Sequence, residues 1–338
     1  TSVIAFIFGA IFFVGGRKIG LLIYKSPEVG ELLRALSPIV PLMYLDSISD
    51  GILKQLSESY RKIRNTARYI LGNIHDFNPN TDMMEFSDLQ EIDKWALIRL
   101  SKLTEKVLAA YRAYEFHIVQ HAIHNFCIVD MSNFYLDVIK DRLYTQKANS
   151  SARRAAQTTM YKILDALVKL LAPVLAYTAE EIWSFMPHTD KENQEFVLLN
   201  DMPKPTPELY DEAFEAKWDQ ILAVKADVSK ALENARAAKV IGHSLGADVE
   251  IFADGALYDL LSGMKDDLVT YFIVSDVSVK PVSEANGGTH TGETGIQVRV
   301  TQAEGEKCER CWMFSKTVGQ SHDHPTLCAR CASVLKED

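Results

Sequence analysis

The sequence predicts a mainly α-helical fold, in which a helical bundle is followed by a small α/β module and a C-terminal knuckle built on four cysteines. Apolar residues recur at steps of three and four through residues 52–187, which is the period of one helix face. Between residues 249 and 279, two β-type runs flank a helical run, as in a small α/β unit. Two Cys-x-x-Cys pairs lie near the C-terminus.

The composition bounds the class of protein. The 338 residues carry a net charge of −9, with 47% apolar and 24% charged residues, which is the ordinary mix of a soluble globular chain of two or three domains. An acidic chain binds nucleic-acid phosphates only where basic residues are concentrated, because the local field decides. The cysteines do not form the spread framework of a small secreted fold, so we expect free thiols and a cytoplasmic location.

Residues 1–46 form an atypical apolar N-terminal segment. Residues 3–14 are almost wholly apolar, but a membrane-spanning helix needs about 20 such residues. Arg17 and Lys18 follow the run, whereas a secretory signal carries its basic residues in front. We expect a buried strand or helix, or a non-native leader, and keep a membrane segment as the weaker alternative. The start at Thr1 rather than Met suggests a fragment or a trimmed product.

Residues 47–188 are expected to form the bundle, since several long helical patterns are joined by short loops. The expected helices cover residues 53–71, 88–114, 117–144 and 152–171. Ser87, with Gln90 three residues later, resembles a capping box at the start of the second helix.

Residues 189–282 are expected to form a linking α/β module. Its expected elements are a helix over residues 211–239, strands over 249–253 and 271–279, and a helix over 256–264. Residues 283–338 are expected to contain a flexible linker over 283–295, which is rich in Gly, Thr and Asn, then a strand over 296–300 and the knuckle.

The cysteine spacing predicts one structural zinc ion. Cys308 and Cys311 are separated from Cys328 and Cys331 by sixteen residues, within the range of four-cysteine zinc sites. Four thiolates complete the tetrahedron around Zn2+ and leave no position for a reacting water. A segment of about 30 residues buries too little apolar area to fold alone, so the metal would supply the folding free energy. The alternatives are disulfides, uncoordinated thiols and the rival ligands His322 and His324.

Arg310 and Trp312 flank Cys311 and have two interpretations. A Trp beside a metal turn usually packs against it. An Arg–Trp pair on a rigid turn is also a platform for an unpaired base. These residues alone favour neither.

A local basic run occupies residues 54–68. Its basic residues are Lys54, Arg61, Lys62, Arg64 and Arg68, and its only acid is Glu58, so the local balance of five minus one is +4. Arg61, Arg64 and Arg68 are spaced i, i+3, i+7 and share a helix face. A solvated face is the ordinary explanation, but an excess of one sign favours phosphate contacts.

The remaining candidates are weaker. His117, His121 and His124 share one stripe, but they lack the Glu of a metalloprotease motif and have apolar neighbours. Cys127 is expected to pack in the core. The sequence contains no phosphate-binding glycine loop, dinucleotide-binding fingerprint or Gly-x-Ser-x-Gly elbow, so we assign no catalytic residue.

Several motifs resemble one family. Residues 57–73, SESYRKIRNTARYILGN, resemble the opening helix of the anticodon-binding domain of bacterial-type isoleucyl-tRNA synthetases. Residues 125–144, with NFC, DMSNFYLD and KDRLY, and residues 172–183, with APVL and TAEEIW, resemble further blocks of that domain. Residues 235–245 resemble the linking module, and residues 303–312 resemble the family's zinc knuckle, which the related valyl enzyme does not share.

The resemblance covers about residues 47–338 and implies a monomer that binds the anticodon stem-loop of tRNA(Ile). It implies that Arg310 and Trp312 contact the anticodon, and we expect Arg61, Lys62, Arg64 and Arg68 to contact phosphates. The family's ATP-handling motifs and its editing domain are missing from this sequence. ATP-dependent charging of tRNA with isoleucine is therefore implied for the full enzyme only.

Two other functions stay open. The chain would be a zinc-containing interaction protein if it kept the scaffold but lost tRNA binding, and the apolar N-terminal segment would then tether it to a membrane. Certain DNA-repair glycosylases carry a similar terminal knuckle, so a DNA-binding relative is the third hypothesis. The helical bundle argues against it, and we expect no DNA partner.

Overall fold

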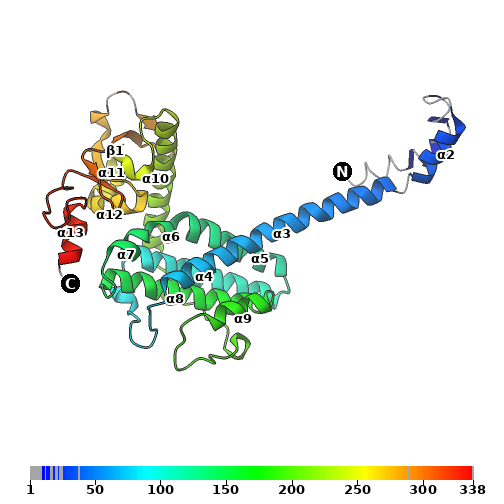
Figure 1. The fold of residues 1–338 in the computed structure, drawn as a ribbon, viewed down its shortest axis with the longest axis horizontal. Coiled ribbons are helices and arrows are strands. Elements are labelled where there is room, and N and C mark those ends of the chain that lie inside the picture. The colour runs from blue at the N-terminus through cyan, green and yellow to red at the C-terminus, as the bar shows by residue number, and fades with distance from the viewer. Residues whose placement is uncertain are drawn as a thin grey trace. The chain divides into compact units, whose positions relative to one another are not determined.

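The computed structural model describes residues 10, 11, 13–15, 18, 19, 22, 26–36, 39–285, 287 and 289–336 (Figure 1). Helices dominate the described residues, as the apolar periodicity predicted. The chain divides into two compact units, Thr1–Arg64 and Asn65–Asp338. Most of the apolar run at residues 3–14, for which a strand, helix or leader was expected, lies outside the described residues. No described helix is long and apolar enough to cross a membrane.

The first unit contains α2 (Pro27–Leu36) and most of α3 (Ile39–Asn73). The Ser26 hydroxyl accepts a hydrogen bond from the Val29 amide at 3.4 Å, which satisfies one of the free amides at the start of α2. α3 runs without a break through the expected boundary between residues 46 and 47.

The second unit begins with the end of α3 and continues as a helical bundle (Figure 1). Its helices are α4 (Glu91–Arg112), α5 (Phe116–Asn125), α6 (Leu136–Val138), α7 (Lys140–Thr145), α8 (Ser151–Leu171) and α9 (Ala176–Ser184). Trp95 of α4 packs edge-on against Phe134, with ring centroids 5.0 Å apart, and lies 5.5 Å from the ring of Trp218. These rings are buried at the centre of the core that the apolar pattern predicted.

Two local expectations in the bundle are wrong. Ser87 caps no helix, because it lies in a 3-10 turn (Phe86–Asp88) and its hydroxyl donates to Asp88. The continuous helix expected over residues 117–144 is interrupted by a π-helix (Phe126–Tyr135), after which α6 and α7 are short. Such wide turns are rare, and no apolar period marks them in a sequence.

A buried ion pair joins α7 to α4. The Arg142 guanidinium donates two hydrogen bonds to the Asp93 carboxylate, each 2.7 Å long, and also donates to the Ala152 carbonyl. The Tyr135 hydroxyl donates to the same carboxylate at 2.7 Å. Burial and the neighbouring Asp93 raise the pKa of Tyr135, so the phenol stays a proton donor. The carboxylate is therefore fully partnered, as a buried charge must be.

The second unit continues with α10 (Glu212–Ala237) and a four-stranded mixed sheet in the order β2-β1-β4-β3. The strands are β1 (Ala247–Ala253), β2 (Asp276–Pro281), β3 (His290–Thr291) and β4 (Gln297–Gln302), with α11 (Gly255–Gly263) and α12 (Lys265–Phe272) between β1 and β2. β1 pairs parallel with β2 and antiparallel with β4. Asp211 caps α10 by accepting hydrogen bonds from the amides of Ala213 and Phe214.

The second strand is shorter than the sequence pattern suggested. Tyr271 and Phe272 were expected in a strand but complete α12, and their rings are buried. Ile273 takes a left-handed backbone conformation at φ 58°, which ends the helix, and β2 begins only at Asp276. Aromatic residues suit strands and buried helix faces alike, so their type could not separate the two.

The prediction of a flexible linker over residues 283–295 is wrong for the residues that the structure describes there. The segment contains β3, and the Asp227 carboxylate of α10 accepts hydrogen bonds from the amides of Glu293 and Thr294 at 2.8 and 3.0 Å. The Thr294 hydroxyl donates to the same carboxylate at 2.6 Å. A Cβ at Gly292 would lie 2.2 Å from the Asp227 side chain, so glycine is required for this approach.

The buried pair yields a test of the bundle. We expect Arg142→Met to lower the free energy of unfolding by about 3–5 kcal/mol, because it leaves the buried Asp93 carboxylate unpaired. Urea unfolding followed by circular dichroism measures this change. Lys140→Met is the matched control, since it breaks only the exposed pair with Asp137 and should cost at most about 1 kcal/mol. Equal losses in the two variants would contradict the assignment.

Candidate metal centre and nucleic-acid interface

The four-cysteine knuckle, called the finger from here on, covers residues 305–336 and begins with a two-stranded ribbon. β5 (Glu306–Lys307) pairs antiparallel with β6 (Phe314–Ser315). Gly305, at φ 92°, precedes this ribbon, and a Cβ there would lie 2.3 Å from the carbonyl carbon of Ser315. Only glycine therefore allows the two segments to approach so closely. Cys308 follows β5 directly, so the ribbon fixes the position of the first cysteine pair.

The second cysteine pair is held by a helix. Cys328 immediately precedes α13 (Ala329–Lys336), and Cys331 lies in its first turn. The ligand atoms of all four cysteines lie within 4.8 Å of one another, and Cys311 Sγ is 3.8 Å from Cys328 Sγ. A tetrahedral site with Zn–S bonds of about 2.3 Å has sulfur–sulfur edges of about 3.8 Å. The four cysteines therefore fit a tetrahedral thiolate-bound metal.

The structure does not support disulfides or histidine ligands as alternatives to the four-cysteine set. All five cysteines are free thiols. Within the part of the chain that the structure describes, the four finger cysteines form the only group of potential ligands close enough to share a metal ion. That group includes neither His322 nor His324, and it includes none of the stripe His117, His121 and His124. Cys127 is buried in the bundle, as expected for a packing residue.

The electrostatics of the cluster favour a bound cation. Burial raises the pKa of Cys308, but hydrogen bonds from the amides of Cys311, Cys328 and Arg310 outweigh it and bring the pKa to about 6. Burial and the neighbouring thiols raise the pKa of Cys331. Four thiols this close cannot all ionise by themselves, because the thiolates repel one another. A divalent cation removes that repulsion and lets all four act as ligands.

The Trp312 side chain is exposed to solvent and does not pack in the finger core. The backbone of this residue lies in the left-handed region at φ 66°, a conformation that costs a non-glycine residue about 1–2 kcal/mol. Its side chain remains 59% exposed, so burial does not offset this cost. The finger core consists of Cys308, Cys328 and Cys331 with Cys311, Val318 and Leu327 against it, and does not include Trp312.

Two contacts orient the Trp312 ring. The indole Nε1 donates to the Glu309 carbonyl at 3.1 Å, and the Lys307 ammonium lies 4.9 Å from the ring centroid. The ring is therefore held in place while it remains accessible. An exposed, oriented and positively flanked aromatic ring suits a nucleic-acid base.

Arg310 lies between the finger and the bundle. One of its guanidinium nitrogens, Nη2, donates to the Thr145 carbonyl at the end of α7, at 3.2 Å. The sequence analysis did not predict this contact. It also did not single out Arg330, whose guanidinium donates hydrogen bonds of 2.6 and 2.8 Å to the Asp141 carboxylate of α7. The one signal in the sequence was that both cysteine pairs read Cys-x-Arg-Cys.

The four basic residues expected on phosphates all lie on α3 and are exposed. Arg61, Lys62 and Arg64 belong to the first unit, and Arg68 belongs to the second. Neither Arg61, Arg64 nor Arg68 has an acidic partner within 4.0 Å among the described residues. Their charges are therefore not neutralised by neighbouring carboxylates of the described part of the chain.

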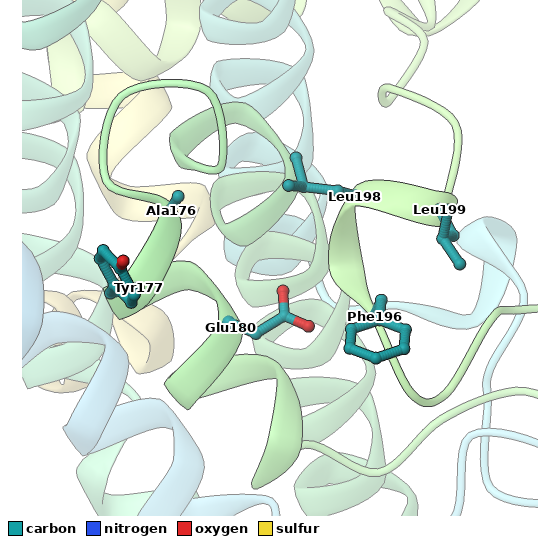
Figure 2. A pocket seen from close by; sticks show the side chains of 6 residues that line it. All are labelled: Ala176, Tyr177, Glu180, Phe196, Leu198 and Leu199. Atoms are coloured by element: carbon teal, nitrogen blue, oxygen red, sulfur yellow. The ribbon is translucent and has the colours of Figure 1, made fainter.

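One pocket involves none of these residues (Figure 2). It is an open apolar hollow of about 340 Å³ lined by Ala176, Tyr177 and Glu180 of α9 and by Phe196, Leu198 and Leu199. The last two residues belong to a short 3-10 helix (Val197–Leu199). The Glu180 carboxylate accepts from the Val197 amide at 3.3 Å, which ties the two walls together. The sequence assigned this surface no role.

Two family models match the chain. The model described as anticodon-binding domain of tRNA ligase matches residues 93–251, from α4 to β1. The model described as zinc finger found in FPG and IleRS matches residues 305–334, which include all four finger cysteines.

Several isoleucine–tRNA ligases are similar to the chain. That of Caldanaerobacter subterraneus subsp. tengcongensis is 51% identical over 291 residues, which are 86% of this chain and 31% of that protein. That of Desulforudis audaxviator is 44% identical over 330 residues, which are 95% of this chain and 35% of that protein. The chain thus spans about a third of the length of the curated relatives it matches. The longer match also reaches into residues 1–46, which the quoted motifs do not cover.

The helical bundle, the mixed sheet and the four-cysteine finger define the anticodon-binding region of a tRNA ligase. The model that matches the finger and the similar proteins point, within the tRNA ligases, to those for isoleucine. The chain belongs to the isoleucine–tRNA ligase family, of which it is the C-terminal part, as the motifs predicted.

Removal of the metal tests the centre. A strong chelator should unfold residues 305–338 and leave the bundle helical, because the finger core consists almost entirely of the metal ligands. Hydrogen exchange read by mass spectrometry should show a loss of protection in the finger alone. Cys328→Ser should reproduce this state, and Cys127→Ser, the control outside the cluster, should not. Unchanged protection of the finger in metal-free protein would refute the claim.

Proposed function

We propose that this chain recognises the anticodon stem-loop of tRNA(Ile) as the C-terminal part of an isoleucine–tRNA ligase, in the cytoplasm and as a monomer. The observation that carries the proposal is Trp312, an exposed ring held in a costly backbone conformation on the four-cysteine finger. Local strain without packing gain is typical of functional positions. Joining isoleucine to tRNA at the expense of ATP is assigned to the whole ligase, of which this chain spans about a third.

The finger is proposed to bind one structural Zn2+ through Cys308, Cys311, Cys328 and Cys331. Tetrahedral four-thiolate sites suit zinc or iron, and the matching family model, which is described as a zinc finger, favours zinc. Since the four sulfurs saturate the ion, no position is left for a substrate or a reacting water. The metal would thus shape the surface that reads RNA and take no chemical part.

Base reading is proposed for Trp312 and Arg310. The Trp312 ring would stack on an unpaired anticodon base, and Lys307 above the ring would lie near the adjoining phosphate. Arg310 donates one N–H to the Thr145 carbonyl, and its other donors, which bind nothing in the described part of the chain, would contact a base edge or a phosphate. Phosphate contacts are proposed for Arg61, Lys62, Arg64 and Arg68, because their charge is concentrated on one helix of an acidic chain.

Substitution of Trp312 tests base reading. We expect Trp312→Ala to weaken binding of the cognate anticodon stem-loop roughly tenfold or more, since stacking is worth about 1–3 kcal/mol per base. Stem-loops with other anticodons should lose little. Fluorescence anisotropy with labelled RNA measures both, and Trp312→Phe, which keeps a stacking ring, should retain most of the affinity.

The outcomes separate the competing functions. A Trp312→Ala protein that keeps its zinc and its full anticodon preference would remove Trp312 from the interface. A wild-type chain that binds no stem-loop would favour the zinc-containing interaction protein. Equal affinity for a DNA hairpin of the same sequence would favour the DNA-binding relative, because the ribose hydroxyl would then contribute nothing.

Substitution of the arginines tests phosphate contact. The triple variant Arg61→Gln, Arg64→Gln, Arg68→Gln should weaken binding to cognate and non-cognate stem-loops alike. The slope of log affinity against log salt should fall by about 0.7–0.9 for each phosphate that is no longer neutralised. The control variant Lys191→Gln, Lys230→Gln, Lys265→Gln removes the same charge from other exposed positions. An identical slope change in both variants would mean that only the net charge matters.

A further inference from the structure

The two metal-binding turns share a feature that the metal does not require. Each cysteine pair carries an arginine as its third residue, in Cys308-Glu309-Arg310-Cys311 and in Cys328-Ala329-Arg330-Cys331. Both arginines reach the same short helix, α7. The coincidence of position and target indicates a common role in attaching the finger to the bundle.

The two contacts differ in strength. Arg330 makes a two-pronged contact, since Nη1 and Nη2 donate to the two oxygens of the Asp141 carboxylate at 2.6 and 2.8 Å. Paired charge-assisted hydrogen bonds of this kind fix orientation as well as distance. Arg310 makes a single hydrogen bond of 3.2 Å to the Thr145 carbonyl. The first contact therefore anchors the finger and the second limits its rotation.

α7 presents both acceptors on one side. Asp141 and Thr145 are four residues apart, and the Thr145 hydroxyl donates to the Asp141 carbonyl at 2.8 Å and to its side chain at 3.3 Å. The helix itself is held firmly. Arg142 lies between the two acceptors in the chain and forms the buried pair with Asp93, while the Arg153 side chain donates to the Leu143 carbonyl. The finger thus binds to a helix whose position is fixed by its own contacts with the bundle.

The metal sets the distance between the two arginines. Arg310 and Arg330 come from different cysteine turns. The four converging sulfurs hold these turns together, with a hydrogen bond of 3.2 Å from the Glu309 amide to the Thr326 carbonyl. The two acceptors belong to residues one helical turn apart on α7, whose Cβ atoms are spaced by about 5–6 Å. Loss of the metal would leave the four sulfurs unconnected, and the two arginines would then no longer be held at the spacing of both acceptors.

Arg330 also lies against the metal centre. Its guanidinium interacts electrostatically with the Cys311 sulfur, and Nη2 donates a hydrogen bond of 3.6 Å to Met313 Sδ. Arg330 therefore binds the Asp141 carboxylate and also interacts with one of the four cysteines of the cluster. A Zn2+ ion held by four thiolates would carry net negative charge, which the Arg330 guanidinium would offset. Outer partners of this kind commonly change metal affinity by about 10–100-fold.

We propose that the two Cys-x-Arg-Cys turns form a clamp on α7 that closes only when the metal is bound, with Asp141 and Arg330 as positioning residues. The clamp couples metal binding to docking of the finger, and the coupling acts in both directions. Its consequence for RNA, which rests on the proposed function, is that the clamp holds Trp312 at a fixed place relative to the bundle.

Zinc affinity of the full chain tests the clamp without RNA. We expect Asp141→Asn to weaken zinc binding about tenfold or more, measured by competition with a chromogenic chelator. Asp137→Asn is the matched control: this carboxylate lies on the neighbouring turn, and its one ion pair within the described ranges is with exposed Lys140, so zinc affinity should stay unchanged. Equal zinc affinities of the Asp141→Asn and Asp137→Asn proteins would overturn the proposal.

A double-mutant cycle separates direct coupling from a loss of folding. Arg330→Gln should weaken zinc binding as Asp141→Asn does, and the double variant should lose little more than either single variant. Arg330→Lys keeps the charge without the two-pronged geometry and should fall between wild type and Arg330→Gln. Fully additive losses would show that the two residues act independently and would contradict the clamp. Bundle unfolding in urea should be the same in all of these proteins.

RNA binding provides the second arm. Asp141→Asn saturated with zinc should discriminate less well between cognate and non-cognate stem-loops, although Trp312 is intact. If wild type binds no stem-loop, the proposed function fails, and the zinc measurements alone decide the clamp. If zinc affinity falls in Asp141→Asn but anticodon discrimination stays at the wild-type level, the metal coupling stands and the positioning of Trp312 is refuted.

Discussion

Burial of the charged pair between Arg142 and Asp93 constrains the part of the molecule that would meet RNA. A buried carboxylate must be matched by donors at fixed distances, so α7 has little freedom to shift against α4. α7 in turn receives the finger through Asp141 and Thr145. The ion pair in the bundle thus limits the movement of the helix to which the finger is attached.

The finger is held from a second side by the α/β module. The Ser275 hydroxyl donates to the Leu245 carbonyl at 2.6 Å and accepts from the Phe314 amide at 2.7 Å, which joins the entry to β2 to the finger ribbon. Phe314 also lies near Gly246, where a Cβ would be 3.5 Å from its ring. The module that links the bundle to the finger therefore also limits where the ribbon can go.

Periodicity and spacing predicted what depends on local chemistry. The bundle helices, β1 and the four-cysteine cluster follow from apolar steps and from Cys-x-x-Cys pairs, which are visible in any single window of sequence. The π-helix, the end of α12 at Ile273 and the fixed loop on Asp227 were missed because each depends on tertiary contacts. Arg330 was missed for the same reason, since its partner lies 189 positions away in the chain.

The four tryptophans differ in solvent exposure, and this difference can be detected by their fluorescence. Trp95, Trp183 and Trp218 are buried in the core, whereas Trp312 is open to solvent. A dissolved collisional quencher therefore reaches the emission of Trp312 far more readily than that of the other three. The molecule carries a native optical probe at the finger tip, and occupancy of that tip can be followed without attaching a dye.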